Sequence, residues 1–71
     1  MARVKTREEK LFAAAVLRRS FELRGEDHGA AFKFVYDGVL RDLELADEDV
    51  VAHLRAHSAE VDAAIGRRGG T

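Results

Sequence analysis

The chain contains no cysteine, which excludes disulfide bonds, thiolate-bound metals and thiol nucleophiles. It also lacks any apolar run close to the roughly 18 residues that span a bilayer. The longest such run covers only residues 11–17, and the charged residues 1–10 do not have the pattern of a secretory signal. We therefore expect a cytoplasmic protein that does not bind membranes. Arginine outnumbers lysine and alanine is abundant, which hints at a GC-rich bacterial genome.

Side chains suited to catalysis are scarce. The hydroxyl groups belong to Thr6, Ser20, Tyr36, Ser58 and Thr71, and no histidine is placed to activate one of them. No glycine-rich turn precedes a helix to bind an oxyanion or a phosphate. Carboxylates cluster only at residues 42–49, where a solvated helix start accounts for them. The sequence therefore predicts a protein that is not an enzyme and that uses no cofactor.

Residues 7–24 have the pattern of a helix. Thr6 stands three residues before Glu9, which is the spacing of a capping box. Neither glycine nor proline follows until Gly25, which suits a left-handed C-cap. Because residues 11–17 are apolar nearly all round, we expect this helix to be covered on more than one side.

Residues 47–68 have the pattern of a second helix. Asp47 is suited to the N-cap position, and two further acidic residues follow it in the first turn. Gly69 and Gly70 would end the helix. Apolar and small residues at alternating spacings of three and four predict a core-facing stripe of Val51, Leu54, Ser58, Val61 and Ile65.

The middle segment fits two structures. As a helix with Asp27 as its N-cap, it would place one apolar face toward the core, made of Phe32, Val35, Tyr36, Val39 and Leu43. As a hairpin, it would turn at Asp37-Gly38, a strong turn signal. We favour the helix because its period runs through Asp37-Gly38 without a break.

Together these segments predict one small all-α domain over residues 1–71, folded as a three-helix bundle. The alternative is an α+β fold, α-β-β-α, with a hairpin turning at Asp37-Gly38. In either case we expect frayed ends at about residues 1–5 and 69–71.

Two histidines are the main candidate metal ligands, and His28 could in principle supply a third. His53 and His57 are one turn apart on the predicted last helix, a spacing found in helical zinc sites. A structural zinc site needs four ligands, and no cysteine is available. We therefore predict that both histidines are boundary or surface residues and that no metal is bound.

Charge is unevenly distributed along the chain. Residues 1–24 are mostly basic and residues 37–49 mostly acidic, so the two regions are expected to attract each other within the fold. A basic arm of Arg3, Lys5, Arg7 and Lys10 could contact nucleic-acid phosphates. However, the only candidate recognition helix begins with three acidic residues, which would repel phosphate. Nucleic-acid binding is therefore the alternative function.

The favoured function is a small non-catalytic regulatory or adaptor module that acts through protein–protein contact. A chain this short without disulfides often needs another subunit for stability, so we expect a homodimer that also binds another protein. The candidate interface residues lie on the first helix at Phe12 and Val16 and along a stripe of small residues on the last helix, Ala52, Ala56, Ala59 and Ala63.

Overall fold

The computed structural model describes residues 6–69 of the chain. These residues form four helices, namely α1 (Arg7–Leu23), α2 (Ala30–Leu43), α3 (Asp47–Ala56) and α4 (Ser58–Gly69). The predicted all-α class is confirmed. The hairpin alternative is wrong, because Asp37 and Gly38 lie inside α2. None of the described helices is long and apolar enough to cross a membrane. The frayed ends predicted for residues 1–5 and 70–71 lie outside the described residues, and Gly69 is the last residue of α4.

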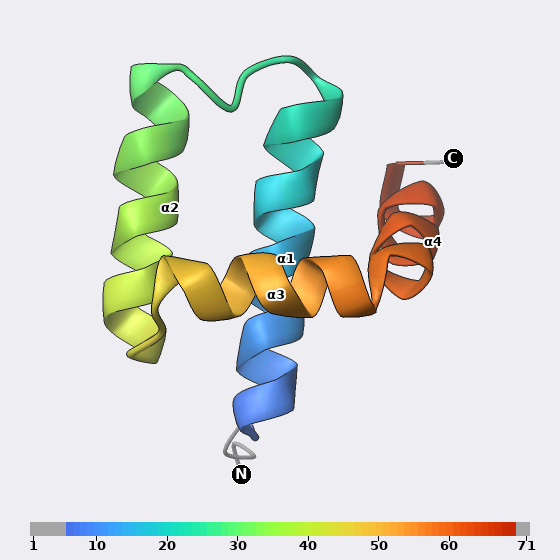
Figure 1. Ribbon diagram of the computed structural model, residues 1–71. Coiled ribbons are helices and arrows are strands. Elements are labelled where there is room, and N and C mark those ends of the chain that lie inside the picture. Colours follow the sequence, from blue (N-terminus) through green and yellow to red (C-terminus); the bar gives the residue numbers. More distant parts are fainter. Residues whose placement is uncertain (1–5, 70–71) are drawn as a thin grey trace, which may run out of the picture.

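The first helix is the centre of the bundle (Figure 1). Helices α2 and α4 lie on either side of α1, and α3 crosses it on a third side. This arrangement explains why residues 11–17 are apolar around most of the helix circumference, because three elements cover them. The buried core consists of Leu11, Ala14, Ala15, Val16, Phe32, Tyr36, Val50, Val61 and Ala64.

The ends of α1 follow the predicted capping pattern. The backbone N–H of Glu9 donates to Thr6 Oγ1 at 3.2 Å, and the Thr6 N–H donates to Glu9 Oε1 at 3.1 Å. At the other end Gly25 has a φ of 70°. The Gly25 N–H donates to the Glu22 carbonyl and the Glu26 N–H donates to the Phe21 carbonyl, which is a Schellman motif. Both capping predictions are confirmed.

The N-terminal end of α2 differs from the sequence prediction. The helix begins at Ala30 after Gly29, an N-cap without a side-chain hydrogen bond, so the predicted N-cap at Asp27 is wrong. The turn that follows α1 continues to Gly29, whose N–H donates to the Glu26 carbonyl at 3.2 Å, and this delays the start of the helix. At its C-terminus α2 ends at Leu43, and the C-cap Glu44 adopts the left-handed conformation with a φ of 57°.

The predicted helix over residues 47–68 is divided, so the described residues form four helices rather than three. Its predicted N-cap at Asp47 is wrong, because Ala46 is the N-cap of α3 and Asp47 is the first helical residue. Helix α3 ends at Ala56, His57 departs from helical geometry with a φ of −125° and a ψ of 31°, and α4 begins at Ser58. No glycine or proline marks this break. A straight helix of that length would extend about 33 Å. The bend instead brings two fully buried residues, Val50 from α3 and Val61 from α4, into the core beside α1.

The bend also changes the core-facing stripe that was predicted for this segment. Val61 is buried as expected, whereas Ser58 is exposed. Val50, which lies beside the predicted stripe, is fully buried, and Ala64, which the prediction did not include, is buried as well. Because α3 and α4 point in different directions, each presents its own face to α1, and a single period through both cannot describe the core.

Candidate functional site

The main candidate site is an apolar groove on the side of α1 that α3 leaves open. It has a volume of about 750 Å³ and lies over α1 between α2 and α4. We call it the α1 groove. Its lining consists of Ala13, Val16, Leu17, Ser20 and Leu23 of α1 with the C-cap Arg24, Val39, Asp42 and Leu43 of α2, and Ile65 of α4.

The floor of the groove is effectively apolar, although it contains a serine. The Ser20 hydroxyl donates to the Val16 carbonyl oxygen at 2.7 Å, so its donor is already used within α1. Leu17 packs against the core from the floor, and Leu23 at one end is among the most exposed large hydrophobic residues. An apolar partner could therefore cover this surface without leaving a buried donor unpaired.

Opposite charges stand at the two ends of the groove. Arg24 lies at the C-terminal end of α1, and Asp42 lies near the C-terminal end of α2. Since α2 runs back alongside α1 (Figure 1), these two residues are at opposite ends of the groove. Arg24 also pairs with Glu26 at 2.8 Å and lies over the Phe21 ring, with its guanidinium carbon 4.6 Å from the ring centroid.

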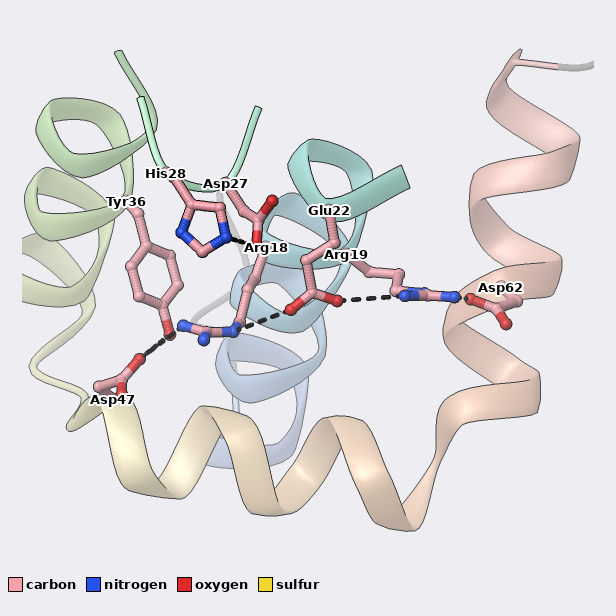
Figure 2. Close-up of polar contacts among 8 residues, drawn as sticks. All are labelled: Arg18, Arg19, Glu22, Asp27, His28, Tyr36, Asp47 and Asp62. Atoms are coloured by element: carbon pink, nitrogen blue, oxygen red, sulfur yellow. Dashed lines mark hydrogen bonds and ion pairs between the residues drawn. The ribbon is translucent and has the colours of Figure 1, made fainter. Parts of the chain in front are cut away.

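A polar cluster on the other side of α1 joins the walls of the groove to its floor (Figure 2). Tyr36 of α2 donates its hydroxyl to Asp47 Oδ1 at 2.7 Å, and Arg18 Nη1 donates to the same oxygen at 2.8 Å. Arg18 also pairs with Glu22 at 3.4 Å. Burial raises the pKa of Tyr36 to about 12, and the hydrogen bond to Asp47 contributes in the same direction.

The cluster continues to α4 through Arg19. Its Nη1 lies 3.2 Å from Glu22 Oε1, and its Nε lies 3.1 Å from Asp62 Oδ1 of α4. Figure 2 shows this chain of contacts running from Tyr36 across α1 to Asp62. It ties α2 and α4 to opposite sides of α1 and thereby helps fix the width of the groove.

The expected charge pairing within the fold is present in part. Arg7 of α1 pairs with Asp49 at the start of α3, at 3.1 Å, and Arg18 pairs with Asp47. These contacts use two basic residues of the N-terminal region. In the basic arm predicted for nucleic acid, Arg3 and Lys5 lie outside the described residues, and Lys10 is half-buried on α1.

The two histidines are brought together, as their spacing predicted. The His53 and His57 ring centroids lie 4.4 Å apart, and His57 Nδ1 is 3.3 Å from Glu60 Oε1. Burial lowers the pKa of His53, and the nearby His57 adds to this shift. Within residues 6–69, no group of three or more histidine, aspartate or glutamate side chains could hold a metal ion.

The predicted interface residues do not form one surface. Val16 is buried, with 5% of its surface exposed. Phe12 is half-buried and meets the His53 ring edge-on, with the centroids 6.5 Å apart. The four alanines are exposed but divided, with Ala52 and Ala56 on α3 and Ala59 and Ala63 on α4. The bend at His57 therefore interrupts the proposed stripe.

Sequence reasoning missed the α1 groove. Its apolar residues belong to three helices, and within each helix they follow the same period as the core residues beside them. The only sequence signal is the excess of apolar residues in α1. Comparison of the chain with protein-family models, with curated proteins and with solved structures gave no match.

Proposed function

We propose that this protein is a non-catalytic regulatory or adaptor module that binds an amphipathic helix of another protein in the α1 groove. The observation that carries the proposal is the groove itself, an apolar cavity of about 750 Å³ between two helices that the polar cluster ties to its floor. Insertion of an amphipathic helix into such a groove is a recurring mode of protein recognition.

The dimensions of the groove set the size of the bound helix. From Ala13 to Arg24 the floor follows α1 for about 16 Å, or three helical turns. A helix of that length presents apolar side chains at positions i, i+4 and i+7. We therefore expect a segment of about 11 residues with three aliphatic anchors.

The charges at the ends favour one direction of binding. A helix that runs parallel to α1 places its N-terminus near Asp42 and its C-terminus near Arg24. Its macrodipole then meets an acidic side chain at the positive end and a basic side chain at the negative end. A basic residue near the N-terminus of the partner helix and an acidic one near its C-terminus would add to this preference.

A designed peptide tests the proposal directly. The probe has about 12 residues, leucine anchors at i, i+4 and i+7, lysine in its first turn and glutamate in its last. On titration, amide chemical-shift changes should concentrate on groove residues, and a peptide with the two charged ends exchanged should bind more weakly. Leu23→Glu places a charge in the groove and should abolish binding. Phe34→Glu, the same kind of change outside the groove, should leave it unchanged.

Either of two results would overturn this function. One is shift changes located away from the groove, and the other is equal affinity of the parent and the Leu23→Glu variant. Nucleic-acid binding has less support, because Arg7, Arg18 and Arg19 are engaged in ion pairs with acidic side chains of the same chain. Binding of random duplex DNA with a steep salt dependence would favour that alternative. Self-association is part of the proposed function.

A further inference from the structure

Helix α2 carries a second apolar stripe that faces away from the core. Ala31, Phe34, Val35 and Gly38 follow the spacing of one helix face, separated by three, one and three residues. We call these four residues the outer α2 stripe. Phe34 is 84% exposed, whereas Phe32 and Tyr36 are buried. Val35 is 40% exposed, so the prediction that it faces the core is wrong. The stripe therefore presents a large aromatic ring to solvent without a function in the bundle core.

Gly38 is the second unusual feature of this stripe. Glycine is among the least favourable residues in the interior of a helix. A Cβ atom at this position would meet no other atom within 4 Å, so the bundle itself does not require glycine there. A position without a side chain allows another helix to approach the backbone closely.

From these two features we infer that the protein forms a two-fold homodimer in which the outer α2 stripes pack against each other in antiparallel orientation. In the register centred on residue 36, Phe34 of one copy lies over the partner's Gly38, and the contact is repeated by symmetry. The same register places the two Val35 side chains beside each other, offset by about 3 Å along the helix axis. Such an interface is self-complementary, as a two-fold axis requires.

The charges beside the stripe fit the same register. Asp37 lies beside Phe34 on one flank of the stripe, Lys33 lies further round the helix on the same side, and both are exposed. A two-fold axis brings this flank against the same flank of the other copy. Lys33 then lies within about 3 Å, measured along the helix axis, of the partner's Asp37. The two opposite-charge pairs that result favour this antiparallel register over others.

The size of the stripe sets the strength of the dimer. One pair of helices with 14 residues each buries less surface than a standard stable interface. We therefore expect a dissociation constant on the order of 10 μM, so that monomer and dimer exchange at working concentrations. This inference develops the self-association in the proposed function, but it does not depend on the α1 groove.

Sedimentation equilibrium of the full chain from about 1 to 200 μM tests the dimer. The parent should change from monomer to dimer across this range. Phe34→Ala and Gly38→Ala should each weaken the dimer about tenfold or more. Phe34→Ala removes the aromatic ring from the interface, and Gly38→Ala places a methyl group where the partner's Phe34 ring packs. Gly38→Ala should also raise the melting temperature of the dilute monomer by about 5 °C, since alanine is the better helix former. A general loss of folding cannot produce these opposite effects.

Two control variants separate this interface from other arrangements. Leu23→Glu should not change the dimer, because Leu23 lines the groove and not the outer α2 stripe. If Leu23→Glu abolishes assembly, Phe34 occupies the groove of another copy and the two-fold arrangement is wrong. Exchanging the charges in the double variant Lys33→Asp and Asp37→Lys should preserve dimerisation, whereas either single change should weaken it. A parent that remains monomeric at 200 μM would overturn the inference and leave the groove proposal untouched.

Discussion

Removal of one oxygen atom from Tyr36 tests how the polar cluster holds α2 against the start of α3. In Tyr36→Phe the ring remains in place, stacked on Phe32 with the centroids 4.9 Å apart, and only the hydroxyl is lost. The hydrogen bond to Asp47 Oδ1 disappears with it. Because Tyr36 is only 3% exposed, water does not readily replace this contact.

The size of the effect follows from the state of the acceptor. A hydrogen bond to an ionised group contributes about 1.5–3 kcal/mol to stability. Two features reduce this value here. The Asp47 side chain is 57% exposed, and Arg18 still donates to the same oxygen. We therefore expect Tyr36→Phe to lower the free energy of unfolding by about 1 kcal/mol. For a chain of this length that corresponds to a fall in melting temperature of roughly 4–8 °C.

A double-mutant cycle measures the contact itself. Asp47→Ala alone should cost more than Tyr36→Phe, because it also removes the ion pair with Arg18 and an acidic residue from the first turn of α3. In the Asp47→Ala background the further change Tyr36→Phe should cost little. The expected coupling energy is about 1 kcal/mol, measured by urea unfolding of the four proteins.

The same contact can be followed spectroscopically. The chain has one tyrosine and no tryptophan, so tyrosinate absorbance reports on Tyr36 alone. In the folded protein the pKa of Tyr36 is raised to about 12 by burial and by Asp47. In urea it should return to about 10. Because the folded-state pKa is the higher one, this stability contribution is fully present below about pH 10 and is lost between about pH 10 and 12.

Two outcomes would contradict the assigned contact between Tyr36 and Asp47. A folded-state titration midpoint near the ordinary pKa of about 10 would mean that the phenol is neither buried nor bound to Asp47. A coupling energy indistinguishable from zero would mean that the hydroxyl and the carboxylate act independently. Circular dichroism recorded during the alkaline titration shows whether the chain is still folded when the phenol ionises.

The remaining predictions concern His53 and the two left-handed caps. Because the pKa of His53 is lowered in the folded protein, the unfolded chain takes up the proton first, and stability should fall as the pH drops below about 6.5. Thermal unfolding at about pH 7 and 5 should show a smaller fall in His53→Gln, whereas His28→Gln, a change at an exposed histidine, should behave as the parent. Gly25 and Glu44 both have a positive φ, which is strained for every residue except glycine. Gly25→Ala should therefore lower the free energy of unfolding by about 1 kcal/mol, and Glu44→Gly should raise it by up to about 1 kcal/mol. Equal stability of the two cap variants by urea unfolding would contradict the assigned backbone conformations.

Much of the fold could be predicted from local sequence signals. The capping box of Thr6 and Glu9 and the left-handed Gly25 depend on residues within one turn of each other, so the sequence alone determined where α1 begins and ends. The unbroken helical period likewise predicted α2 through Gly38. The His53 and His57 rings also meet because four residues separate them along the chain. In each case the deciding interaction is short-range.

The tertiary structure decided the features that depend on several helices at once. The break at His57 has no breaker residue, and it arises where the chain must place both Val50 and Val61 against α1. The α1 groove combines side chains from three helices, none of which encodes it alone. Periodicity in one helix tells which residues share a face, but only the packing of the other helices decides whether that face is covered. Around α1 the other three helices leave a groove open, and on α2 the rest of the bundle leaves Phe34 exposed.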